Sequence, residues 1–248
     1  PVVGDCKTAL KGILELIEKK SPEDFKNNRQ EWLDRIQKWK DTTPLKYEQG
    51  SDIIKPQFVI EKLYELTKGN ALITTEVGQN QMWAAQYYHF DEPNNFITSG
   101  GLGVMGFGLP AAIGAKAACP DKLVVDVAGD GSIQMNIQEL MTAIESKIDV
   151  KIVILNNKFL GMVRQWQELF YEKNYSSTNM ENAPDFVKLA EAYGATGLRC
   201  TQPDEVESTL TEGLNTKGTV VMEFAVDREE SVYPMVPAGG AITEMLLV

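Results

Sequence analysis

The chain has 248 residues, 43% of them hydrophobic, and its 35 acidic residues outnumber 24 basic ones to give a net charge of −11. A chain of this length can bury a large core without disulfides, and its negative charge argues against a partner bound through nucleic-acid phosphates. No apolar stretch reaches the roughly 18 to 20 residues of a membrane span, so we expect neither nucleic acid nor membrane among its partners.

The cysteines indicate the redox compartment of the protein, and the first residues indicate whether the chain is complete. Cys6, Cys119 and Cys200 are far apart and odd in number, which predicts buried apolar thiols in a reducing compartment and no disulfide framework or zinc site. Residues 1–5 resemble neither a signal peptide nor a natural start. We therefore expect the chain to be a piece of a longer protein.

Residues 1–55 are predicted to be the helical end of a preceding domain plus a linker. Apolar residues at helical spacing predict two helices between residues 5 and 40, with a break at Ser21-Pro22. The second helix has an apolar stripe that we expect to pack: Trp32, Ile36 and Trp39. The polar composition of residues 41–55 is typical of a linker.

Residues 56–248 are predicted to form a second domain, because helix and strand patterns alternate. The predicted helices cover residues 57–67, 79–88, 106–118, 133–146, 162–170, 185–193 and 204–214. The predicted strands cover residues 71–75, 96–97, 123–127, 151–155, 196–199 and 219–226. This order predicts an α/β fold with a doubly wound, mostly parallel sheet and helices on both faces. Ligands of such sheets bind beyond the carboxyl ends of the strands, where the winding reverses.

Two glycine-containing segments follow predicted strands. In the first, Glu76-Val77-Gly78-Gln79-Asn80, the helix start directs backbone N–H groups toward an anion, although the segment is also compatible with an ordinary turn and Glu76 with a charge at the rim. In the second, residues 99–110, five glycines in nine positions predict close approach of the backbone to a flat ring. A Rossmann fingerprint is the alternative for its GxGxxG, but it lacks the accompanying acidic residue.

The third motif pairs Asp130, in Gly-Asp-Gly-Ser, with Asn157, twenty-seven residues later. Each ends an apolar run, so on neighbouring parallel strands a carboxylate and an amide oxygen would meet at one edge of the sheet. Such hard oxygen ligands suit Mg²⁺, which binds through one or two protein groups and the oxygens of a phosphate. The alternative is a pair of ordinary turns.

These motifs, with Leu160-Gly-Met-Val-Arg-Gln-Trp166 and Tyr233-Pro-Met-Val-Pro-Ala-Gly-Gly240, resemble the C-terminal portion of the acetolactate synthase (acetohydroxyacid synthase) catalytic large subunit. The likeness covers about residues 56–240, and residues 1–20 are similar to the end of the family's middle domain. It implies the thiamine diphosphate-binding fold.

The resemblance implies roles for individual residues. Asp130, Asn157 and the main-chain oxygen of Phe159 would bind Mg²⁺. The implied cofactor-binding residues are Val77, Gly78, Gln79, Asn80, Gly103, Met105, Gly129, Asp130, Gly131, Ser132, Asn157, Phe159, Leu160, Gly161 and Met162. Trp166 would face the substrate, a core aromatic on a helix being the alternative. The family usually has His where this chain has Asn80, an Asn that can still donate to a phosphate oxygen.

The activity implied by the resemblance is decarboxylation of pyruvate and its ligation to a second 2-keto acid such as 2-ketobutyrate. The products, acetolactate or acetohydroxybutyrate, would serve branched-chain amino-acid (isoleucine and valine) biosynthesis. The family's activating glutamate lies on an N-terminal domain, so we expect no catalytic residue here and an inactive isolated chain. FAD would be bound mainly by a middle domain.

The resemblance also implies a homodimer or tetramer, with or without a regulatory small subunit, in the cytoplasm of a bacterium or the plastid or mitochondrion of a eukaryote. Two alternatives stay open at this point. One is another thiamine-diphosphate 2-keto acid decarboxylase or oxidase. The other is a non-catalytic binding module.

Overall fold

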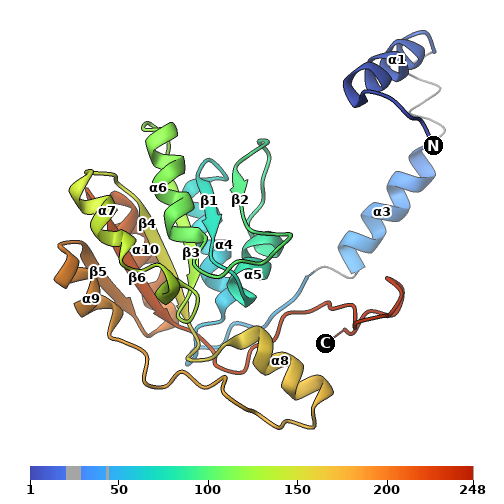
Figure 1. The fold of residues 1–248 in the computed structure, drawn as a ribbon. Helices are drawn as coiled ribbons and strands as arrows, with labels where there is room; N and C mark the ends of the chain where they lie inside the picture. Colours follow the sequence, from blue (N-terminus) through green and yellow to red (C-terminus); the bar gives the residue numbers. More distant parts are fainter. Residues whose placement is uncertain (21–28, 43–44, 248) are drawn as a thin grey trace. The chain divides into compact units, whose positions relative to one another are not determined.

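The computed structural model describes residues 1–20, 29–42 and 45–247 (Figure 1). The chain divides into two compact units, residues 1–46 and 47–248. In the first unit, α1 spans Cys6–Glu18 and α3 spans Gln30–Thr42. The predicted break at Ser21-Pro22 lies outside the described residues.

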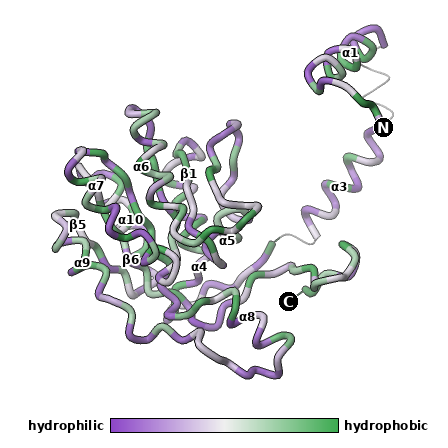
Figure 2. Tube along the Cα trace, viewed as in Figure 1, coloured by the Kyte–Doolittle hydropathy of each residue, from purple (hydrophilic) through white to green (hydrophobic). Residues whose placement is uncertain are grey.

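The two described helices of the first unit expose most of their apolar residues. Trp32 and Trp39 contact each other edge to face, with ring centroids 5.6 Å apart, and about half of each side chain is exposed. The predicted apolar stripe of α3 is therefore wrong as a packing surface within the described residues. Most of α3 is drawn as hydrophilic in Figure 2.

The second unit contains the predicted alternation of helices and strands. Its helices are α4 (Pro56–Thr67), α5 (Gln79–Tyr87), α6 (Gly108–Ala118), α7 (Glu139–Glu145), α8 (Gly161–Phe170), α9 (Phe186–Tyr193) and α10 (Val206–Asn215), with 3-10 turns η1 (Ile133–Met135) and η2 (Pro203–Glu205). Its strands are β1 (Leu72–Thr75), β2 (Phe96–Ile97), β3 (Val124–Gly129), β4 (Lys151–Asn156), β5 (Thr196–Cys200) and β6 (Val220–Ala225).

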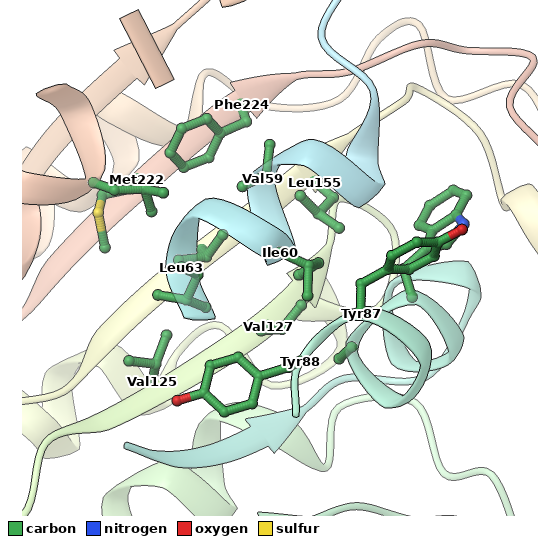
Figure 3. Close-up of a cluster of buried hydrophobic side chains, with 14 of the residues drawn as sticks. Val59, Ile60, Leu63, Tyr87, Tyr88, Val125, Val127, Leu155, Met222 and Phe224 are labelled. Carbon is green, nitrogen blue, oxygen red and sulfur yellow. The ribbon is translucent and has the colours of Figure 1, made fainter. Parts of the chain in front are cut away.

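The described strands form one parallel six-stranded sheet in the order β2-β1-β3-β4-β6-β5. Neighbouring residues of the central strands point to opposite faces, so each strand contributes to two cores. Val125 and Val127 of β3 belong to the core beneath α4, α5 and α10 (Figure 3). Val124 and Ala128 belong to the core beneath α6, α7 and α9. The predicted α/β fold with helices on both faces is confirmed.

One predicted helix, residues 133–146, is broken in the structure. The chain forms η1, leaves helical geometry at Asn136 (φ −136°, ψ 29°) and resumes as α7. The Asn136 side-chain amide donates to the Gly106 carbonyl at 2.8 Å, a bond to a distant loop that competes with continuation of the helix. Within this segment Ile133 and Leu140 are buried, whereas Met141 is 39% exposed.

The predicted burial of the cysteines is confirmed for Cys200 and wrong for Cys6 and Cys119, which are exposed. None of the described helices combines the length and apolar character that crossing a membrane requires.

The winding of the sheet reverses between β1 and β3. From β1 the chain adds β2 on one side, and the later strands lie on the other side. The residues that follow β1, β3 and β4 at their carboxyl ends are those of the predicted motifs. The fold therefore brings these motifs to the position where α/β sheets bind their ligands.

Candidate functional site

A pocket of about 260 Å³ lies at the carboxyl ends of β1, β3 and β4. All fifteen residues predicted to bind a cofactor line it. Three more lining residues were not predicted: Trp83, Leu155 and Val163. Trp83 and Leu155 are buried members of the core, and nothing in their sequence pattern distinguishes a pocket wall from ordinary core.

Asp130 is the acidic residue of this pocket, and its carboxyl group is almost fully buried. Burial raises its pKa to about 7, against the lowering effect of hydrogen bonds from the backbone of Asp130 itself and of Asn157. Its Oδ2 atom is buried without a hydrogen-bond partner among the described residues. A buried carboxylate with an unpaired oxygen is costly unless a cation neutralises it.

Asn157 lies at the tip of the neighbouring strand. The register pairs Gly129 with Leu155, so Asp130 and Asn157 follow adjacent strands at the same edge of the sheet. The Asn157 side chain is buried, with Oδ1 accepting from the backbone N–H of Phe159 at 3.0 Å and Nδ2 donating to Gln79 Oε1 at 3.1 Å. The structure therefore brings the two predicted ligands to one edge of the sheet and into one pocket.

The donor set fits a hard divalent cation. No group of three or more His, Cys, Asp or Glu side chains suited to a metal occurs in the described ranges. A cation at Asp130 would then depend on amide, carbonyl and phosphate oxygens, which is the manner in which Mg²⁺ binds. Phe159, whose carbonyl is the third predicted ligand, is held by a bridge to Asn179 and lines the same pocket.

The glycine-rich loop forms another wall of the pocket through Gly103 and Met105. Gly106 has φ +85°, and a Cβ there would lie 2.7 Å from Asn136 Nδ2 and 2.8 Å from Met135 Cβ. Glycine at 106 therefore permits both the left-handed backbone and the close approach of η1. The loop follows β2, a two-residue strand at the edge of the sheet.

Glu76 is fully buried and is not a charge at the rim, a position that the sequence did not reveal. Its carboxylate accepts from Gly106 N (2.7 Å), Leu109 N (3.1 Å) and Ser132 Oγ (2.7 Å). Burial raises the pKa of Glu76, while the hydrogen bonds from Ser132 and from the loop backbone oppose that rise.

Two side chains predicted to bind the cofactor already have protein partners. The Ser132 hydroxyl donates to Glu76 and accepts from the Val77 backbone N–H. Asn80 Nδ2 donates to the carbonyls of Glu76 (3.1 Å) and Val127 (2.8 Å). Since a hydroxyl has one hydrogen and an amide nitrogen two, these bonds leave anion binding at this end of the pocket to backbone N–H groups.

Trp166 lies beside the pocket and not in the core, since 42% of its surface is exposed. It lines a second pocket of about 480 Å³, which shares Met162 and Val163 with the first. Its ring contacts Phe170 edge to face at 5.9 Å. The alternative of a core aromatic is therefore wrong.

Residues 76–224 match the family model described as thiamine pyrophosphate enzyme, C-terminal TPP binding domain. The chain belongs to this family. The membership agrees with the predicted fold and rules out the Rossmann interpretation of the glycine-rich loop. It also accounts for the coincidence of Asp130, Asn157 and the glycine-rich loop around one pocket.

The chain is similar along its whole length to acetolactate synthase large subunits. It is 49% identical to the isozyme 3 large subunit of Escherichia coli over 250 residues, covering all of this chain and 44% of the relative. It is 49% identical to the mitochondrial catalytic subunit of acetolactate synthase from Saccharomyces cerevisiae, a match that covers 88% of this chain and 32% of the relative. It is 43% identical to the chloroplastic acetolactate synthase 1 of Nicotiana tabacum, a match that covers 99% of this chain and 38% of the relative. The chain thus spans less than half the length of these relatives.

Proposed function

We propose that the chain is the C-terminal thiamine diphosphate-binding domain of an acetolactate synthase large subunit. The complete subunit would decarboxylate pyruvate and join it to a second 2-keto acid, giving acetolactate or acetohydroxybutyrate for branched-chain amino-acid biosynthesis. Similarity to acetolactate synthases over the whole chain supports this proposal, together with membership in the cofactor-binding family.

The observation on which the proposal depends most is the buried carboxyl of Asp130, with an unpartnered oxygen, beside Asn157. We propose that both residues, with the carbonyl of Phe159, bind Mg²⁺ and through it the diphosphate. The cofactor, when bound, supplies the electron sink for decarboxylation. The protein's part is to fix the diphosphate at the sheet edge and to support the ring with Gly103 and Met105.

We interpret this pocket as half of a complete cofactor site. Its volume of about 260 Å³ lies below the roughly 300 to 1,000 Å³ of complete ligand sites, and Asp130 is the only acidic residue among its described lining residues. We propose that the activating glutamate comes from an N-terminal domain across a dimer interface, in a homodimer or tetramer. The chain alone would then be inactive.

Further parts of the proposal concern the rest of the protein. The first unit would be the end of a middle domain that binds FAD, and a regulatory small subunit would bind elsewhere. Trp166, exposed beside the pocket, would contact the second 2-keto acid and favour 2-ketobutyrate. By analogy with the named relatives, the enzyme would work in the bacterial cytoplasm or in a eukaryotic mitochondrion or plastid.

The test is Asp130→Ala in the full-length subunit, with the exposed Asp121→Ala as matched control. Mg²⁺-dependent binding of thiamine diphosphate, followed by fluorescence quenching, should be abolished in the first variant and retained in the second. Undiminished cofactor binding and activity in Asp130→Ala would refute the proposed metal site.

Product analysis separates the rival functions. With pyruvate the unmodified full-length subunit should form acetolactate. Acetaldehyde as the main product would favour a 2-keto acid decarboxylase, and acetate would favour an oxidase. Absence of turnover by the cofactor-loaded, full-length protein would favour a non-catalytic binding module.

A further inference from the structure

Three buried amide side chains form a line that leads away from the predicted metal ligand. Asn157 Nδ2 donates to Gln79 Oε1 at 3.1 Å, and Gln79 Nε2 donates to Gln165 Oε1 at 3.0 Å. Gln165 Nε2 in turn donates to the carbonyl of Val232 at 2.9 Å. All three amides are at least nine-tenths buried, so water does not supply substitute partners.

The line has a fixed direction because it ends on backbone groups. Val232 donates from its N–H to Gln165 Oε1 at 2.9 Å and accepts from Gln165 Nε2, so the Gln165 amide fits in one orientation. A backbone N–H only donates and a carbonyl only accepts, which makes the flipped Gln165 lose both bonds.

The orientation of Gln165 determines that of Gln79. Gln79 Nε2 has two acceptors, Gln165 Oε1 and the Glu230 carbonyl at 3.1 Å. Its Oε1 must therefore face Asn157, which in turn must present its nitrogen. The oxygen of Asn157 is left on the opposite side, where it accepts from Phe159 N near Asp130.

Two further features hold this line in place. Glu230 binds Lys55 Nζ at 2.5 Å and Gln57 Nε2 at 2.7 Å, which ties the segment to the start of α4. At the start of α8, Gly161 provides the necessary space. A Cβ at Gly161 would lie 2.0 Å from Gln79 Oε1 and 2.7 Å from Asn157 Nδ2.

We propose that residues 230–232, acting through Gln165 and Gln79, orient the Asn157 amide so that its oxygen faces the cation. Gln79 and Gln165 are thus positioning residues for a metal ligand. The inference rests on the proposed function, because it concerns the same Mg²⁺ site. Its physical basis is simple: a flipped Asn157 would present an N–H₂ group, which cannot ligate a cation.

The experiment measures Mn²⁺ binding by electron paramagnetic resonance in the full-length subunit at saturating thiamine diphosphate. Gln79→Met keeps the length of the side chain and removes its polarity, and it should weaken Mn²⁺ binding by about ten- to a hundredfold. Gln165→Met should weaken Mn²⁺ binding less, because Gln165 lies one hydrogen bond farther from Asn157 than Gln79 does. Gln86→Met is the control, because Gln86 Nε2 donates at 3.1 Å to the carbonyl of Tyr233, the residue after this segment, and forms no hydrogen bond with Gln79 or Asn157.

Repeating the Gln79 substitution in an Asn157→Asp variant distinguishes loss of the orientation of residue 157 from a general structural effect. Asn157→Asp has two equivalent oxygens, so the direction of its side chain no longer matters. In this background Gln79→Met should cause little further loss of Mn²⁺ affinity. An equal loss in both backgrounds, or unchanged affinity in Gln79→Met alone, would overturn the inference while the proposed function stands. Absence of Mn²⁺ binding by the unmodified subunit would overturn both.

Discussion

The Ser132 hydroxyl donates to the buried carboxylate of Glu76, with 2.7 Å between Oγ and Oε2. The same carboxylate accepts hydrogen bonds from the backbone N–H groups of Gly106 and Leu109. One side chain therefore joins the end of β1, the glycine-rich loop and the turn that follows β3, which are three walls of the pocket.

We predict that Glu76→Gln destabilises the chain by about 1 to 3 kcal/mol, because an amide nitrogen cannot accept from a donor that the carboxylate oxygen now binds. Ser132→Ala removes one donor and should cost about 1 kcal/mol. Urea unfolding followed by fluorescence measures both. The exposed Glu145→Gln serves as control and should stay within about 0.5 kcal/mol of the unmodified chain. A Glu76→Gln variant of unchanged stability would contradict the assigned role.

Two glycines of α6 are predicted to respond oppositely to alanine. A Cβ at Gly108 would lie 2.3 Å from Asp126 Oδ1, 2.5 Å from Glu76 N and 2.7 Å from the Thr75 carbonyl carbon, and backbone atoms of a central strand cannot move aside cheaply. Gly108→Ala should therefore cost about 3 kcal/mol or more. Gly114 has no atom within 4 Å of the added carbon, so Gly114→Ala should stabilise α6 by about 0.5 to 1 kcal/mol. Thermal unfolding of the two variants compares them directly, and similar melting temperatures would refute the prediction.

Asp126 is predicted to make stability depend on pH. Burial, and then the nearby charge of Glu76, raise the pKa of Asp126 well above its usual value, although Thr74 Oγ1 donates to it at 3.1 Å. The folded chain then retains a proton that the unfolded chain releases near pH 4. The contribution of Asp126 to stability is complete at low pH and is lost as pH rises toward the folded-state pKa, by about 1.4 kcal/mol for each pH unit.

Asp126→Asn removes this titration with little change in shape. The stability of the variant relative to the unmodified chain should increase as the pH rises above about 4, as measured by urea unfolding. Asp121→Asn, at an exposed position, serves as the control. A difference between Asp126→Asn and the unmodified chain that is constant with pH would show that Asp126 titrates normally.

The repeating order of helices and strands was predictable, because two-residue and 3.6-residue periods are local properties of the sequence. The interruption at Asn136 was not, since it depends on a carbonyl thirty residues away in Gly106.

Some features of the candidate site were likewise predictable from the sequence, and others were not. Glycines, Asp130 and Asn157 follow strand ends, so the parallel sheet was enough to predict that they meet. The partners of Ser132, Asn80 and Glu76 depend on how side chains turn inside the pocket, and no spacing in the sequence encodes this. Trp83 likewise has the appearance of an ordinary core residue, which it also is.

The position of β6 has a consequence for synthesis. This strand, the last of the sheet in chain order, lies between β4 and β5. Until the ribosome has released residues 220–225, the backbone N–H and C=O groups along one edge of β4 are unpaired and β5 has no neighbour to pair with. A nascent chain at this stage exposes a ready template for pairing with other polypeptides, so chaperone protection has particular value until β6 has been synthesised.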